Sequence, residues 1–138
     1  MISVKIFPLG LEEIGVQALV YPTRDAMYEG MRAWGFSGEI ENTQAACMGM
    51  EGGEKICAAM FFYEDNVGFD VIAHECWHAT CRWLATQGVR TIPTRYKKSF
   101  ISAEAPEERG ARYHGELVNA TLQELFKRTE ISIAPRHL

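Results

Sequence analysis

Two histidines separated by three residues form the feature of this chain with the clearest chemical meaning. They are His74 and His78, and Glu75 directly follows the first of them. On a helix, residues four apart lie one turn above each other on the same face, so both imidazoles can reach one metal ion. Glu75 then lies beside the open position of that metal, where its carboxylate can accept a proton from a bound water. The H-E-x-x-H pattern therefore predicts a metal site with its own base.

The residues around this motif are typical of a helix. The stretch from 69 to 87 is amphipathic and free of proline, and Gly88 follows it in the position of a C-cap. Catalytic zinc sites of this kind use three protein ligands and leave the fourth position to water. We therefore expect one further ligand from outside this helix.

A second helix is predicted from Pro106 to about residue 127, and it offers three candidates for the third ligand: Glu107, Glu108 and His114. Acidic residues in a first turn also complement the positive end of the helix dipole, with no metal involved. Glu108 and His114 are about 240° apart around a helix and cannot both face one ion. We favour Glu108, because the small residues Ala111 and Gly115 on its face would let this helix approach the motif helix closely.

The two motifs together resemble a known group of proteins. IAHECWHAT and, about thirty residues later, EERGARYHGEL are similar to segments of the small zincin-type zinc metallopeptidases encoded in phage and prophage genomes. The resemblance covers roughly residues 54 to 120. Arg112 departs from the pattern, which usually has an aromatic residue there, so the local packing is in question. The resemblance implies that His74, His78 and Glu108 are the zinc ligands. It implies that Glu75 is the catalytic base.

The activity implied by this resemblance is hydrolysis of a peptide bond with Zn²⁺ as the cofactor. Glu75 would take a proton from the attacking water and pass it to the leaving amine. The residue that stabilises the transition state stays open among three neighbours of the third ligand, Arg112, Tyr113 and His114.

Other functions fit the same residues. A catalytically silent zinc-binding module, such as a phage-type accessory protein that binds a host protein, would keep the ligands without turnover. A hydrolase of non-peptide amides fits as well. A SprT-like protease of DNA-associated proteins shares H-E-x-x-H but uses a third histidine, and non-haem iron oxygenases rarely take both histidines from one such helix. Manganese, cobalt or iron could replace zinc, because affinity order alone does not decide the metal.

Length and composition describe one globular domain over residues 1–138, with 47% hydrophobic and 23% charged residues. The net charge of -4 gives no electrostatic footprint for nucleic acid, and no apolar run approaches the length of a membrane span. The four cysteines lack C-x-x-C spacing, and the first residues lack the features of a signal peptide. We therefore expect a cytoplasmic protein with reduced cysteines, a peptide or protein substrate, and no nucleic-acid or membrane partner.

The fold class expected is α+β, a minimal zincin-like domain in which a small mixed sheet packs on the motif helix and the second helix. Four segments have strand-like composition, 2–7, 16–21, 39–50 and 55–63, with a turn at 50–54. A further helix is expected to begin at Thr23 and to end at Gly35.

The segment Ile56–Tyr63 is apolar on both faces, which favours an interior strand or one edge of a cleft. Backbone groups near Met60 to Tyr63 are then candidates to pair with an extended peptide. The stretch from 88 to 105 is long for a structureless connection and is a candidate lid.

Overall fold

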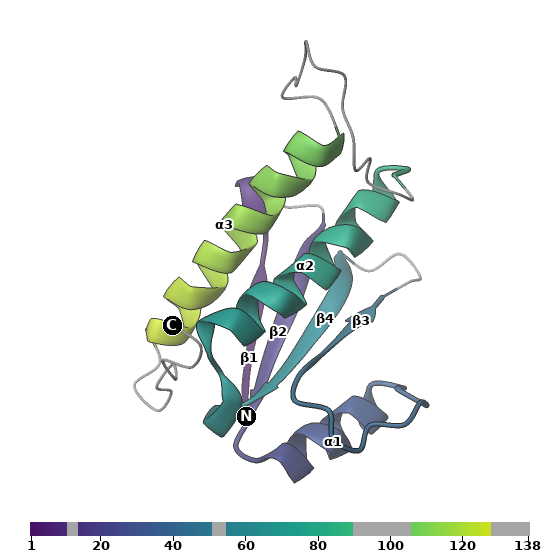
Figure 1. Ribbon diagram of the computed structural model, residues 1–138, viewed down its shortest axis with the longest axis vertical. Helices are drawn as coiled ribbons and strands as arrows, with labels where there is room; N and C mark the ends of the chain where they lie inside the picture. Colours follow the sequence, from purple (N-terminus) through teal and green to yellow (C-terminus); the bar gives the residue numbers. More distant parts are fainter. Residues whose placement is uncertain (11–13, 51–54, 90–105, 128–138) are drawn as a thin grey trace.

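The computed structural model describes residues 1–10, 14–50, 55–89 and 106–127. A four-stranded sheet lies at its centre, with the strand order β1-β2-β4-β3 (Figure 1). The strands are β1 (Ile2–Ile6), β2 (Gly15–Tyr21), β3 (Ala46–Gly49) and β4 (Ile56–Tyr63). β2 and β4 are parallel, whereas β1 and β3 each run antiparallel to their neighbour. The expected α+β class with a mixed sheet is therefore confirmed.

Helices cover both faces of this sheet. α2 (Phe69–Thr86) and α3 (Pro106–Phe126) lie on one face, and α1 (Arg24–Ala33) packs on the other (Figure 1). Two short 3-10 turns, Pro8–Gly10 and Glu64–Asn66, follow β1 and β4. None of the described helices combines the length and the apolar character that a bilayer span requires.

β4 is the buried centre of the fold. Its residues Ala58, Met60 and Phe62 face the cluster under α2 and α3, while Ala59 and Phe61 face the cluster under α1. Every residue of β4 except Tyr63 is buried. A strand covered on both faces has a continuous apolar sequence because neither set of alternate side chains meets water. The interior strand predicted at this position is confirmed.

α1 begins and ends where its local sequence predicts. The Thr23 hydroxyl accepts a hydrogen bond from the Ala26 N–H at 3.1 Å, which is a side-chain N-cap. Met27 and Met31, one turn apart, are fully buried. Gly35 has a φ of +100°, a left-handed conformation that suits glycine beyond a helix end.

The strand expected at 39–50 is much shorter in the structure. Only Ala46–Gly49 pairs with β4, because a turn precedes it. In that turn the Thr43 N–H donates to the Ile40 carbonyl at 3.1 Å, and Asn42 has a φ of +67°. A left-handed residue cannot continue an extended strand. Of the turn predicted at 50–54, residues 51–54 lie outside the described residues.

The ends of α2 agree with the prediction within one residue. The Val89 N–H donates to the Leu84 carbonyl at 2.9 Å, and Gly88 has a φ of +83°. These are the features of a Schellman C-cap, which satisfies carbonyl groups left free at the helix end. The rest of the candidate lid, residues 90–105, lies outside the described residues.

α3 packs along α2 through a face that differs from the predicted one. The Tyr113 ring stacks on Trp83 at 4.1 Å between centroids. A Cβ atom on Gly110 would lie 3.0 Å from Leu84 Cδ1, so the two helices approach closely at this glycine. The expected contact through Ala111 and Gly115 is wrong, because both residues are exposed. α3 is rotated so that its larger apolar side chains are buried instead, including Tyr113, Leu117 and Leu125.

This packing predicts opposite effects for two glycines of α3. Gly115→Ala should raise the free energy of unfolding by about 0.5–1 kcal/mol, because a new Cβ meets nothing within 4 Å and glycine is a poor helix former. Gly110→Leu should lower it by about 1–3 kcal/mol through overpacking against Leu84. Urea unfolding followed by circular dichroism measures both values. Equal effects of the two substitutions would contradict the observed rotation of α3.

Candidate metal centre

α2 brings three potential metal ligands together on its surface. The Nε2 atoms of His74 and His78 are 3.2 Å apart, and the two rings meet edge to face. With Glu75, they form a group whose ligand atoms all lie within 4.8 Å of one another. Two nitrogen ligands on one tetrahedral zinc ion, with bonds of about 2.0–2.1 Å, are about 3.3 Å apart. The two histidines therefore have the spacing that one zinc ion requires.

The burial of these three side chains follows from the way α2 packs. Its buried face is made of residues three and four apart: Ile72, Cys76, Ala79, Thr80, Trp83 and Leu84. Glu75 lies at the border of this face and is only 5% exposed, whereas His74 and His78 are exposed. The carboxylate is thus part of the wall of the site, and the imidazoles point to its open side.

Burial and neighbouring charges shift the pKa values of Glu75 and His78, each in the direction that a metal site with its own base would need. Burial raises the pKa of the Glu75 carboxyl, and the nearby His74 partly opposes this shift. A base works best when its pKa is close to the pH of the reaction. Burial, together with the charges of His74 and Arg82, lowers the pKa of His78. Metals bind the neutral imidazole, so the lowered pKa keeps this ligand available over a wider pH range.

Two hollows flank the histidines along the boundary between α2 and β3. One of about 520 Å³ lies beside His74 and Glu75, and residues 43–45 form its opposite wall. The other, of about 360 Å³, lies beside His78 and is lined further by Cys47, Cys81, Arg82, Ala85 and Val89. The site therefore opens into space on both sides.

The strand that borders this site is β3. β4 has a neighbour on each side, with Ala18 and Cys47 both opposite Met60, whereas β3 lies at the edge of the described sheet. The expectation that backbone groups near Met60 to Tyr63 pair with a peptide is therefore wrong at Met60 and Phe61, which pair with Cys47 and Ala46. Phe62 and Tyr63 lie beyond the register of β3. The short antiparallel strand Ala46–Gly49 covers that side of β4, and its own outer edge lies near the histidines.

Glu108 does not join this group. Within the described residues, His74, Glu75 and His78 are the members of the metal-capable group. Glu108 lies in the first turn of α3, two residues before Gly110, which contacts Leu84. Leu84 follows His78 by six residues, or about 9 Å along a helix axis. The role of Glu108 as the third ligand stays a prediction.

The three candidates for transition-state stabilisation have different positions on α3. His114 Nε2 donates to the Ala73 carbonyl at 3.0 Å, and its ring lies edge-on to Trp77. Tyr113 is completely buried, and burial raises the pKa of its hydroxyl. Arg112 is exposed. Tyr113 is therefore a core residue, and His114 connects α3 to the backbone of the motif helix.

Two residues near the site escaped the sequence reasoning. Arg82 follows His78 by four positions, so helical spacing alone could have placed it on the same face. Cys47 comes from β3, and nothing in the sequence relates it to the motif. Burial is the main cause that raises the pKa of its thiol to about 12, so Cys47 is protonated at neutral pH and is not a nucleophile there.

Comparison of this chain with protein-family models, with curated proteins and with solved structures found no match. The resemblance to zincin-type metallopeptidases rests on the H-E-x-x-H helix and on the segment that begins at Glu107. The case for a metal centre rests on the geometry of His74, Glu75 and His78.

The buried carboxylate predicts a gain in stability when Glu75 is replaced by glutamine in metal-free protein. Because the pKa of Glu75 is raised in the folded state, the folded state binds more protons than the unfolded chain between the two pKa values. Wild-type stability therefore falls as the pH rises through this window. Glu75→Gln should increase the free energy of unfolding at pH 7, and the difference should shrink as the pH falls below the ordinary range of a glutamate.

Urea unfolding of chelator-treated protein at several pH values tests this prediction. The exposed Glu29 on α1 supplies the control, since Glu29→Gln should change the unfolding free energy by no more than about 0.5 kcal/mol. A Glu75→Gln protein that is less stable than wild type at pH 7 would contradict the assigned burial.

Proposed function

We propose that this protein is a zinc-dependent metallopeptidase. The observation that carries the proposal is the 3.2 Å separation of the two Nε2 atoms of His74 and His78. Glu75 lies in the same compact group, close enough to the histidines to act as a general base beside an ion that they hold. These features together favour metal-assisted hydrolysis over an incidental pair of histidines on a helix.

Each residue has a role in this proposal. His74 and His78 hold the ion, and Glu108 is proposed as the third ligand. When bound, the ion supplies a Lewis acid that polarises the peptide carbonyl and lowers the pKa of water. Glu75 takes the proton of the attacking water and delivers it to the leaving amine. Its raised pKa suits both steps, because the same group must accept a proton and then release it.

A peptide is the substrate that the surroundings favour. β3 lies at the sheet edge next to the histidines, and an edge strand offers backbone groups that pair with an extended chain. The hollows on either side of the histidines would accept side chains on both sides of the cleaved bond. Cys47, Cys57, Cys76 and Cys81 are all free, which supports a proposed location in the reducing cytoplasm.

A second candidate is a metal-binding interaction module without turnover. The observation in its favour is that Glu108 stands apart from the metal-capable group of the described residues. Such a module would need the two histidines for binding and would not need Glu75 as a base. Metal content and turnover in matched variants separate the two functions.

Metal content is the first expected outcome. Wild-type protein, freed of tags and loaded with zinc, should retain about one zinc ion per chain, as expected for a mononuclear site. His78→Ala should lose the ion, and Glu108→Ala should lose most of it. His114→Ala should keep it, because the His114 ring already donates to the Ala73 carbonyl. Elemental analysis after removal of excess metal gives the ratio, and a wild-type protein without metal would overturn the proposed function.

Turnover is the second expected outcome of the proposed function. Glu75→Gln should retain zinc but lose about 10²- to 10⁴-fold in kcat/KM, the usual contribution of a general base. Cleavage of denatured casein, followed by mass spectrometry, gives the rate. Zinc-loaded wild type that cleaves nothing would leave the interaction module as the better account. A Glu75→Gln protein with full activity would remove Glu75 from its role.

A further inference from the structure

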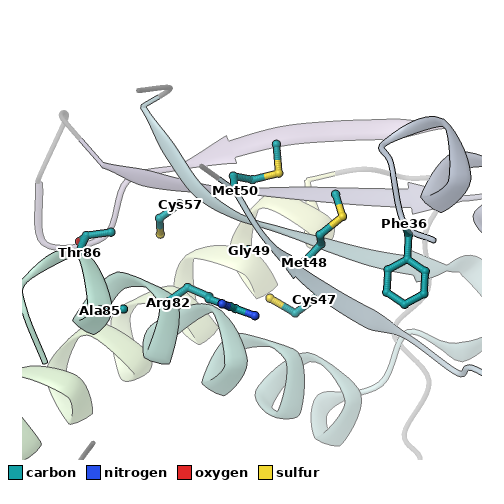
Figure 2. Close-up of a pocket in the computed structure, with 9 residues that line it drawn as sticks. All are labelled: Phe36, Cys47, Met48, Gly49, Met50, Cys57, Arg82, Ala85 and Thr86. Atoms are coloured by element: carbon teal, nitrogen blue, oxygen red, sulfur yellow. The ribbon is translucent and has the colours of Figure 1, made fainter. Parts of the chain in front are cut away.

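Arg82 extends from α2 toward the edge of the sheet, one helical turn after His78 (Figure 2). Within the described residues, no ion pair or hydrogen bond engages its guanidinium. Its charge nevertheless acts on the site: it adds to burial in lowering the pKa of His78, and it opposes the rise that burial causes in the pKa values of the Cys81 and Cys47 thiols. Among the described residues, Arg82 is thus an unpaired cation beside the candidate metal ligands.

The Arg82 side chain packs against Gly49 of β3. A Cβ atom on Gly49 would lie 2.8 Å from Arg82 Nε and 2.9 Å from Cζ. The guanidinium therefore rests directly on the backbone of β3, which is possible only because Gly49 has no side chain. In Figure 2 the Arg82 side chain reaches across from α2 toward Cys47 on β3. Arg82 is held at the edge of the sheet in spite of its exposure to solvent.

Arg82 lines two hollows, and none of the described residues that line them is acidic. One is the hollow of about 360 Å³ beside His78. The other, of about 480 Å³, lies between β3 and the last turns of α2, and Figure 2 shows the residues that line it. Its lining is otherwise uncharged: Phe36, Cys47, Met48, Gly49, Met50, Cys57, Ala85 and Thr86. A cation in such a setting lacks only an anionic partner, and arginine pairs with carboxylates through two parallel hydrogen bonds.

The position of Arg82 determines how far such an anion would be from the histidines. Four residues of helix separate it from His78, which is a rise of about 6 Å. A peptide in extended conformation rises about 3.3 Å per residue. The guanidinium is therefore level with a group about two residues away from a peptide bond held at the histidines.

We propose that Arg82 is a specificity residue that binds a substrate carboxylate about two residues from the cleaved bond. The carboxylate is either the side chain of an aspartate or glutamate or the C-terminal group of the peptide. This inference rests on the proposed peptidase function, and it identifies the substrates as acidic or C-terminal peptide segments.

Four pools of hexapeptides, labelled at the N-terminus with an uncharged fluorophore of the BODIPY type, test the inference. The pools carry either glutamate or glutamine at the fifth position, and each is made with a free or an amidated C-terminus. Binding is measured by fluorescence anisotropy with zinc-loaded Glu75→Gln protein, so that no pool is consumed. Cleavage of the same pools is measured by mass spectrometry with Glu75 intact. The variants Arg82→Gln and Gly49→Ala are compared with Arg32→Gln, which removes an exposed arginine of α1 on the opposite face of the sheet.

The expected result is that a pool with a carboxylate binds about two- to fivefold more tightly than the neutral amidated pool, the usual gain from an ion pair with an exposed arginine. Arg82→Gln should abolish this preference, and Gly49→Ala should reduce it because the guanidinium is displaced with its charge intact. Arg32→Gln should keep it. Preference for glutamate identifies the side chain as the source, and preference for the free C-terminus identifies the terminal carboxylate.

Equal binding of all four pools, or a preference that survives Arg82→Gln, would overturn the inference. Its failure is distinct from failure of the peptidase proposal. Cleavage without any carboxylate preference would keep the peptidase and remove the role of Arg82. Binding that depends on Arg82 without any cleavage would keep the carboxylate site and remove the peptidase. Neither binding nor cleavage of any pool would overturn both.

Discussion

The packing of α2 against both the sheet and the neighbouring helix α3 is the constraint on which the rest of the site depends. The helix buries Ile72, Cys76, Ala79 and Trp83, which recur at intervals of three and four residues. Each residue turns the helix by about 100°, so the burial of this face also sets the direction of every other side chain. His74 and His78 consequently point to the open side, toward the boundary with β3. Any rotation of α2 that improved its packing elsewhere would move both imidazoles together.

The same packing places Glu75 where stability and chemistry conflict. A carboxylate at the border of a core loses hydration, which destabilises its charged form and raises its pKa. The loss weakens the folded state at neutral pH but shifts the pKa of the carboxyl in the direction that the proposed proton transfer requires. Functional sites commonly contain such local conflicts, which the remainder of the fold must offset. The fully buried strand β4 and the stacked pair Trp83 and Tyr113 contribute to that compensation.

β3 gives the site its second wall with only four residues. It pairs with β4 on one side, and α2 packs against it, so that its outer edge lies close to the motif helix. Gly49 lets Arg82 lie on the strand, and Cys47 lies opposite His78 across the smaller hollow. A short strand at a sheet edge thus brings the candidate metal ligands, the two hollows beside them and the Arg82 guanidinium together on one surface.

The sequence by itself determined the features that depend on neighbours within a few positions. The spacing of His74, Glu75 and His78 on a helix, the cap at Thr23 and the buried character of β4 all follow from local chemistry and periodicity. The tertiary structure decided which face of α3 meets α2, that β3 rather than β4 borders the site, and how deeply Glu75 is buried. Periodicity shows that a helix has an apolar face, but it does not show which other helix or strand packs against that face. Those outcomes depend on contacts between residues far apart in the chain, such as Gly110 with Leu84 and Gly49 with Arg82.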